Sequence, residues 1–107
     1  MRDLYDLVVI GAGSGGLTAA SFGREAGADV LLVERDRVGG DCTWTGCVPS
    51  KSLLKAAKVA QQTRMAEKYG ITAADPEVDL EAVMGHVHQI VEEIYAEETP
   101  DALRAQG

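Results

Sequence analysis

The feature that most constrains the fold is a glycine-rich hexapeptide, GAGSGG, at residues 11–16. It directly follows the apolar run 7–10, whose lack of polar alternation is typical of a strand buried on both faces. Small and apolar residues then recur at helical spacing as far as Ala26, and Gly27 is suited to end that helix. A second apolar run, 30–33, predicts another buried strand, which ends in Glu34. This order predicts a parallel β-α-β unit about 30 residues long.

The spacing of the glycines gives each of them a mechanical role in binding a dinucleotide. Gly11 permits a tight turn, Gly13 lets the backbone approach a pyrophosphate, and Gly16 lets the helix pack closely on the strand. The free N–H groups at the start of the helix would receive the phosphates. Glu34, at the end of the next strand, can accept hydrogen bonds from both ribose hydroxyls. The pattern therefore predicts dinucleotide binding but leaves FAD and NAD open, and a glycine-rich turn without a ligand is the plainer alternative.

Three further helical segments are predicted beyond the second strand. Their expected bounds are Pro49 to about Tyr69 with Gly70 as the stop, Asp79 to about Tyr95, and Thr99-Pro100 to Gly107. Two short parallel strands offer too little sheet for two long amphipathic helices to cover. Either partner chains complete this core or the sequence is the front portion of a longer protein, and we favour the longer protein.

Cys42 and Cys47 are the two cysteines of the chain, and their spacing fits neither a zinc knuckle nor a thioredoxin-type motif. In a regular helix the axial rise between them would be about 7.5 Å, whereas a disulfide tolerates a Cα separation of about 4.4–6.8 Å. A bridge would thus require a distorted helix, which the poor helix formers at 43–46 permit. Such a bridge is easily reduced and suits a cycling disulfide, with Lys51 able to stabilise a thiolate. Two unrelated buried thiols are the alternative.

Composition excludes several classes of protein. Ten Lys and Arg residues against 17 Asp and Glu give a net charge of −7, which argues against nucleic-acid binding. No apolar run is long enough for a transmembrane helix, and Asp3 and Asp6 break the pattern of a signal peptide. Because two cysteines are too few for a disulfide-stapled secreted scaffold, we expect a cytoplasmic protein.

No metal site is expected. His86 and His88 are two positions apart in a predicted helix, so they point about 200° away from each other and cannot share an ion. The glutamates of the same helix end are predicted to form an exposed outer face: Glu92, Glu93, Glu97 and Glu98.

Residues 39–51, GGDCTWTGCVPSK, resemble the redox-active signature of the flavin-dependent pyridine nucleotide-disulfide oxidoreductases. That family includes dihydrolipoamide dehydrogenase, glutathione reductase and mercuric reductase. Asp41 and Trp44 are similar to the mercuric-reductase-like branch, because many other members carry Thr and Asn there. The resemblance implies an α/β fold in which residues 1–107 are the N-terminal, incomplete part of a Rossmann-like FAD-binding domain. The NAD(P)-binding domain, the dimerisation domain and the His–Glu acid/base pair would lie outside these residues.

The resemblance also implies FAD, not NAD, on the glycine loop. The implied contacts are Gly11, Gly13, Ser14, Gly15 and Gly16 at the pyrophosphate, Glu34 at the adenosine ribose, Gly40, Asp41 and Cys42 along the flavin, and Lys51 near its reactive edge. Cys42 and Cys47 would form the redox-active disulfide. Cys47 would form the charge-transfer pair with the flavin, and Cys42 would attack the substrate.

The implied activity belongs to a full-length homodimer in cellular redox homeostasis. Electrons would pass from NAD(P)H through FAD to the disulfide and then to a small-molecule disulfide or mercuric substrate, with no nucleic-acid or membrane partner. Residues 1–107 alone would be inactive, because they lack a hydride-donor site and a catalytic base. The rival interpretation is a stand-alone, non-catalytic nucleotide-binding or thiol module completed by a partner chain, and a weaker one is a degenerate segment without a ligand.

Overall fold

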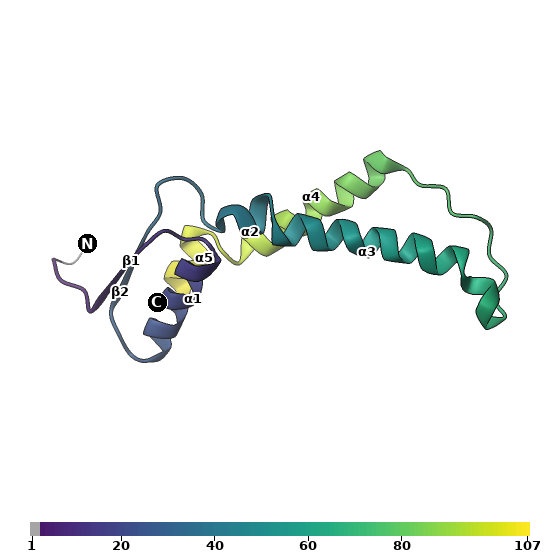
Figure 1. The fold of residues 1–107 in the computed structure, drawn as a ribbon. Helices are drawn as coiled ribbons and strands as arrows, with labels where there is room; N and C mark the ends of the chain where they lie inside the picture. Colours follow the sequence, from purple (N-terminus) through teal and green to yellow (C-terminus); the bar gives the residue numbers. More distant parts are fainter. Residues whose placement is uncertain (1–2) are drawn as a thin grey trace.

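A computed structural model describes residues 3–107 as a mixed α/β chain with a two-stranded sheet (Figure 1). In chain order the elements are β1 (Leu7–Ile10), α1 (Ser14–Glu25), β2 (Val30–Val33), α2 (Gly40–Trp44), α3 (Cys47–Arg64), the 3-10 helix η1 (Ala66–Tyr69), α4 (Leu80–Ala96) and α5 (Pro100–Gln106). The strands are parallel, and their register pairs Leu7 with Val30 and Ile10 with Val33. This architecture confirms the predicted β-α-β unit followed by two long helices, as in the N-terminal part of a Rossmann-like FAD-binding domain.

The two strands are not buried on both faces, contrary to the sequence-based expectation. Helix α1 packs on one face, where Leu7 and Val30 approach the backbone of Gly23. On the opposite face Val8 is 51% exposed and Ile10 is 86% exposed. An unbroken apolar run is typical of a strand whose two faces are both covered. Here α1 covers one face of the sheet, and the face that carries Val8 and Ile10 is exposed.

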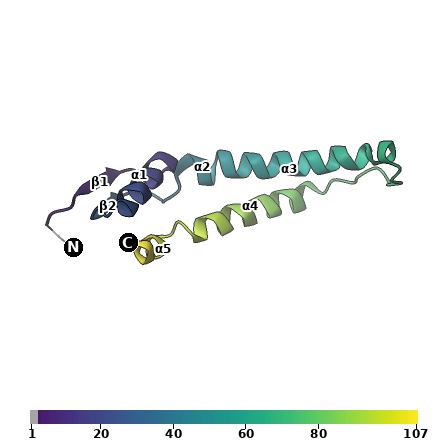
Figure 2. The ribbon, with the colours of Figure 1, turned by 90° about the horizontal axis from the view of Figure 1, so that it is seen from below.

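Helices α3 and α4 form an antiparallel hairpin that extends away from the sheet (Figure 2). The described chain measures 65 × 26 × 19 Å with a radius of gyration of 19.6 Å, whereas a compact domain of 100 residues has about 13 Å. The buried apolar side chains are correspondingly few: Ala12, Val38, Val87 and Val91. They lie in the glycine loop, just before α2, and in α4, so the core sits where the hairpin meets the β-α-β unit.

Local capping chemistry predicted most helix ends correctly. Asp79 caps α4 by accepting a hydrogen bond from the N–H of Ala82 at 3.2 Å, and Thr99 caps α5 through the N–H of Ala102 at 3.1 Å. Helix α3 differs, because it begins at Cys47 rather than Pro49 and ends at Arg64, before η1. Gly70 follows η1 with a φ of +78°, as expected for a stop. Within residues 3–107, no helix is both long and apolar enough to cross a membrane.

Candidate functional site

The glycine loop joins the end of β1 to the first turn of α1. Gly11 has a φ of +100°, which favours glycine, and its N–H donates to the carbonyl of Val33 at 2.7 Å. A methyl group on Gly16 would overlap the carbonyl oxygen of Gly11 in the loop and would lie 3.5 Å from the side chain of Val9 in β1, so the start of α1 packs closely only because this residue is glycine. At Gly13 and Gly15, by contrast, a methyl group would meet no neighbouring element within 4 Å. The loop is therefore tightly packed at Gly16, whereas the space beside the Cα atoms of Gly13 and Gly15, where a side chain would begin, is empty.

The start of α1 carries no capping side chain. Gly13 occupies the N-cap position, and the first turn contains no acidic residue. The first N–H groups of a helix have no partner inside it, and together with the positive end of the helix dipole they favour an anion. This end of α1 therefore has the uncapped N–H groups that a phosphate group would need.

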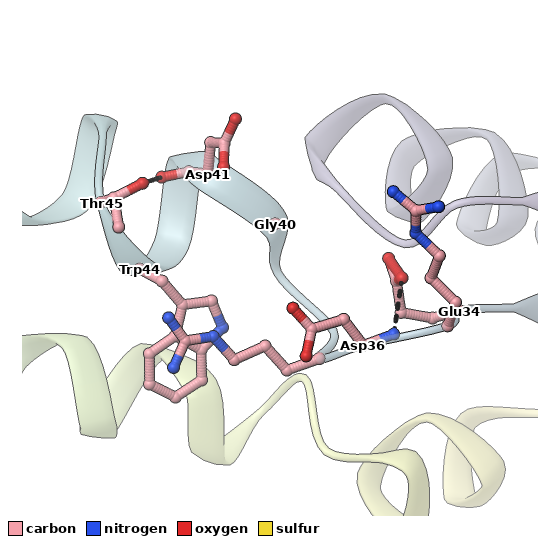
Figure 3. A pocket seen from close by; sticks show the side chains of 8 residues that line it. Glu34, Asp36, Gly40, Asp41, Trp44 and Thr45 are labelled. Atoms are coloured by element: carbon pink, nitrogen blue, oxygen red, sulfur yellow. Dashed lines mark hydrogen bonds between the residues drawn. The ribbon is translucent and has the colours of Figure 1, made fainter.

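Glu34 points back to the glycine loop from the end of β2. Its Oε1 accepts the N–H of Ala12 at 3.0 Å. Its Oε2 accepts the N–H of Asp36 at 3.2 Å, the bond drawn from Glu34 in Figure 3. These backbone donors, Ala12 first, hold the pKa of the Glu34 carboxyl below its ordinary value of 4.5. The structure therefore brings an ionised carboxylate beside the loop.

The segment before the cysteines lies directly on the same loop. The N–H of Gly39 donates to the carbonyl of Ala12 at 2.7 Å. A methyl group on Gly40 would lie 2.9 Å from the Cα of Gly13, and the φ angles of Gly39 and Gly40 are +109° and +59°. The two glycines thus allow α2 to begin in backbone contact with the predicted dinucleotide loop.

A cavity of about 280 Å³ lies between the end of β2 and α2 (Figure 3). Its lining residues are Glu34, Arg35, Asp36, Arg37, Gly40, Asp41, Trp44 and Thr45. The indole N–H of Trp44 donates to the carbonyl of Val38 at 2.9 Å, and the guanidinium of Arg37 lies 4.1 Å from its ring centroid. Tyr95 of α4 contacts the ring at a centroid distance of 4.7 Å. Trp44 is therefore a fixed wall of this cavity.

The helix that carries the cysteines is interrupted between them, as a bridge would require. Helix α2 ends at Trp44 and α3 begins at Cys47, with Thr45 and Gly46 between them. A methyl group on Gly46 would lie 2.9 Å from the carbonyl oxygen of Asp41, so the break is compact because this residue has no side chain. The break meets the condition that a bridge would impose on this segment, although the two cysteines are not bridged.

Both cysteines are unbridged thiols; Cys42 is half-buried and Cys47 is exposed. A hydrogen bond with the side chain of Cys47 raises the pKa of the Cys42 thiol above 9.0, and burial adds to this. The positive charge of Lys51 acts in the opposite direction. The predicted trio of Cys42, Cys47 and Lys51 is thus close enough for its members to influence one another.

One partly buried contact beside Cys42 was not predicted from the sequence. Thr43 is 4% exposed, and its hydroxyl lies 3.1 and 2.9 Å from the two carboxylate oxygens of Glu98. The expectation that Glu98 belongs to an exposed outer face is therefore wrong. The partners are 55 residues apart, so no local pattern could have revealed the contact. No group of three or more His, Cys, Asp and Glu side chains within residues 3–107 is arranged to hold a metal ion.

Comparison with known proteins agrees with this geometry. The sequence profile described as "Pyridine nucleotide-disulphide oxidoreductase" matches residues 5–100. The chain belongs to this family. It is 40% identical to dihydrolipoyl dehydrogenase of Zymomonas mobilis over 84% of the chain and 19% of that protein. It is 38% identical to mercuric reductase of Streptomyces lividans over 96% of the chain and 22% of that protein.

A third relative, dihydrolipoyl dehydrogenase 2 of Haloarcula marismortui, is 51% identical over 70% of the chain and 16% of that protein. This pyridine nucleotide-disulphide oxidoreductase chain therefore spans about a fifth of the length of the curated relatives it matches. These relatives are named for two different activities, dihydrolipoyl dehydrogenase and mercuric reductase.

Proposed function

We propose that the chain forms the FAD site and the redox-active Cys42–Cys47 pair of an enzyme that passes electrons from NAD(P)H to a small disulfide or a mercuric substrate. The observation that carries this proposal is the backbone contact of Gly39 and Gly40 with the glycine loop. It joins the start of the short helix that carries Cys42 to a loop suited to a dinucleotide. Membership of the family and relatives named dihydrolipoyl dehydrogenase and mercuric reductase support it.

The residues present fit FAD. The open positions at Gly13 and Gly15 leave room for close approach, and the start of α1 offers N–H groups to phosphate. When bound, FAD supplies an acceptor for hydride and a donor of electrons to sulfur. The proposed holding residues are Gly11, Gly13, Ser14, Gly15 and Gly16 for the pyrophosphate, Glu34 for the adenosine ribose, and Gly40, Asp41, Cys42 and Lys51 along the flavin.

The two thiols would have different tasks. Reduction of a Cys42–Cys47 disulfide takes two electrons and two protons and gives the two thiols. Since the pKa of the Cys42 thiol is raised, its sulfur attacks a substrate only after a base removes the proton. We assign that base to the His–Glu pair expected outside residues 1–107. Lys51 favours the thiolate by its charge.

The remaining parts of the proposal concern the whole protein. We assign residues 1–107 to the N-terminal, incomplete part of an FAD-binding domain, in a cytoplasmic homodimer that contributes to redox homeostasis. The greater length of the matched relatives supports the assignment to one part of a larger domain. No nucleic-acid or membrane partner is proposed. For nucleic acids, this agrees with the chain's own net charge of −7, which would repel a phosphate backbone.

The test uses the intact protein and its Cys42→Ser and Cys47→Ser variants. The wild type should be purified with FAD and reduce a small disulfide or mercuric ion with NAD(P)H, whereas both variants should keep the flavin and lose this activity. Emission of Trp44, the only tryptophan in the sequence shown, should be quenched by bound flavin and rise when the flavin is removed. Any further tryptophan of the intact protein is replaced for this measurement. Protein without flavin, bright FAD-insensitive emission, or full activity in the variants would contradict the proposal.

A further inference from the structure

We propose that Glu98 is a positioning residue for the Cys42–Cys47 pair. Through the hydroxyl of Thr43 it fixes helix α2 and thereby increases the tendency of the two sulfurs to form a disulfide. The inference rests on the proposed function, because it takes these cysteines as the redox pair. It adds a residue at the end of α4, remote in sequence, that acts on them.

The first observation is that the Thr43 side of the contact is buried. Thr43 is the one buried polar side chain among residues 3–107, and its Oγ1 lies 2.9 Å from Oε2 and 3.1 Å from Oε1 of Glu98. A hydroxyl carries one hydrogen, so the two oxygens share one donor. Loss of Glu98 would leave the buried hydroxyl of Thr43 without this acceptor, which costs more than an exposed hydrogen bond contributes. Loss of the Thr43 hydroxyl would remove the side-chain hydrogen bond between α2 and the end of the hairpin.

The second observation is that Glu98 has a fixed backbone. Its N–H donates to the carbonyl of Tyr95 at 2.8 Å in the last turn of α4, and the next residue, Thr99, caps α5. Tyr95 also contacts the ring of Trp44 in α2. The carboxylate therefore extends from a rigid corner between two helices and is able to hold another element in place.

The third observation connects this contact to the glycine loop. A methyl group on Gly39 would lie 2.6 Å from Oε2 of Glu98 and 2.7 Å from Cβ of Thr43. The same glycine donates its N–H to Ala12 in the loop. Glu98, Thr43 and Gly39 thus form one packed contact that fixes the start of α2 against the loop.

The consequence for Cys42 follows from the size of α2. This helix has five residues, and a helix so short is not stable in water without tertiary contacts. Cys42 directly precedes Thr43 within it. If the contact with Glu98 is lost, α2 samples other positions, and Cys42 spends less time beside Cys47. The equilibrium for forming the disulfide should then fall.

The experiment measures this equilibrium in the intact protein with glutathione. Each bridge transfers two electrons from the two thiols to one glutathione disulfide, which leaves as two glutathione thiols. After alkylation and trypsin digestion, both cysteines lie on the single peptide 38–51, whose mass reports thiols or disulfide. Thr43→Val and Glu98→Ala should each lower the equilibrium constant by roughly three- to tenfold.

Four further variants separate positioning from general destabilisation. Thr43→Ser and Glu98→Gln keep a donor and an acceptor, so they should stay within about twofold of the wild type. Thr63→Val, which changes a threonine in the distal half of α3, and Glu97→Ala, at the exposed neighbour of Glu98, should have no effect. The double variant Thr43→Val/Glu98→Ala should be no worse than either single change, because both remove the same bond.

Each outcome has a defined meaning. Values for Thr43→Val and Glu98→Ala within twofold of the wild type, an equal fall in the controls, or additive effects in the double variant would overturn the inference and leave the proposed function standing. A wild-type pair that never bridges at any glutathione ratio would instead contradict the proposed function, and the inference with it. If Thr43→Val fails to fold, the comparison of Glu98→Ala with Glu98→Gln decides.

Discussion

Glu34 accepts two backbone hydrogen bonds, one from the glycine loop and one from the turn after β2. These bonds favour its charged form, so the pKa of its carboxyl is lower in the folded protein than the ordinary value of 4.5. A carboxyl with a depressed pKa stabilises the fold above its unfolded pKa, and this contribution is lost as pH falls through the folded pKa. Glu34 thus makes the stability of the loop sensitive to acid.

We predict that Glu34→Gln flattens this dependence. A glutamine has one acceptor oxygen, so it cannot satisfy the N–H groups of both Ala12 and Asp36. The variant should unfold more easily than the wild type at neutral pH, and the difference should shrink as pH falls below 4.5. The measurement is the denaturant midpoint at a series of pH values for the two proteins.

The matched control for this prediction is Glu25→Gln, at the exposed end of α1. It should keep the pH dependence of the wild type. If Glu34→Gln also follows the wild-type curve down to roughly pH 3, the two backbone hydrogen bonds do not link the carboxyl to folding.

Helix α4 begins at a side-chain cap. The Oδ1 of Asp79 accepts the N–H of Ala82 at 3.2 Å, which satisfies one of the N–H groups left without a partner at a helix start. We predict that Asp79→Ala lowers the free energy of unfolding by about 1 kcal/mol. Denaturant titration followed by circular dichroism measures this loss.

Asp75→Ala provides the comparison, because Asp75 is an exposed residue of the segment before α4. It should change the free energy of unfolding by less than about 0.5 kcal/mol. Equal losses in the two variants would mean that charge, and not the cap, stabilises the helix.

Helix ends that depend on neighbouring residues could be predicted from the sequence. Asp79, the Thr99-Pro100 pair and Gly70 act on their own helix ends, so their residue types were sufficient. A break between the cysteines followed from the sequence only if they form a disulfide, because a disulfide needs a shorter separation than a helix gives; its place at Gly46 did not follow. The first residue of α3 was not predicted, because Pro49 is equally suited to the third position, whose N–H needs no partner inside the helix.

Contacts between distant elements were beyond sequence analysis. Thr43 and Glu98 meet only because the hairpin returns α4 to α2. A glutamate near other glutamates at a helix end is typical of a solvent-exposed position, and nothing local distinguishes the one that turns inward. The exposed face of β1 was missed for a related reason, since an apolar run shows that burial is needed but not which element provides it.

At the scale of the whole molecule, the described chain exposes large apolar side chains at several separate places. The exposed fractions are 84% for Leu4, 86% for Ile10, 73% for Phe22 and 68% for Leu54. In an elongated chain with a radius of gyration of 19.6 Å, no other described element covers these side chains. Contact with further residues or with other molecules would remove their apolar surface from water, which is favourable.

We predict that residues 1–107, produced alone, associate as their concentration rises, even though a net charge of −7 opposes this. Each buried leucine contributes roughly 1.5–3 kcal/mol, whereas charge repulsion between exposed groups is screened at physiological salt. Light scattering coupled to size exclusion should show a growing mass, and Leu54→Lys should reduce it. Lys55→Glu is the neighbouring control, which changes charge without removing apolar surface and should still associate. A strictly monomeric wild type at all concentrations would mean that the exposed side chains find cover within the chain, which would require a more compact arrangement than an elongated hairpin.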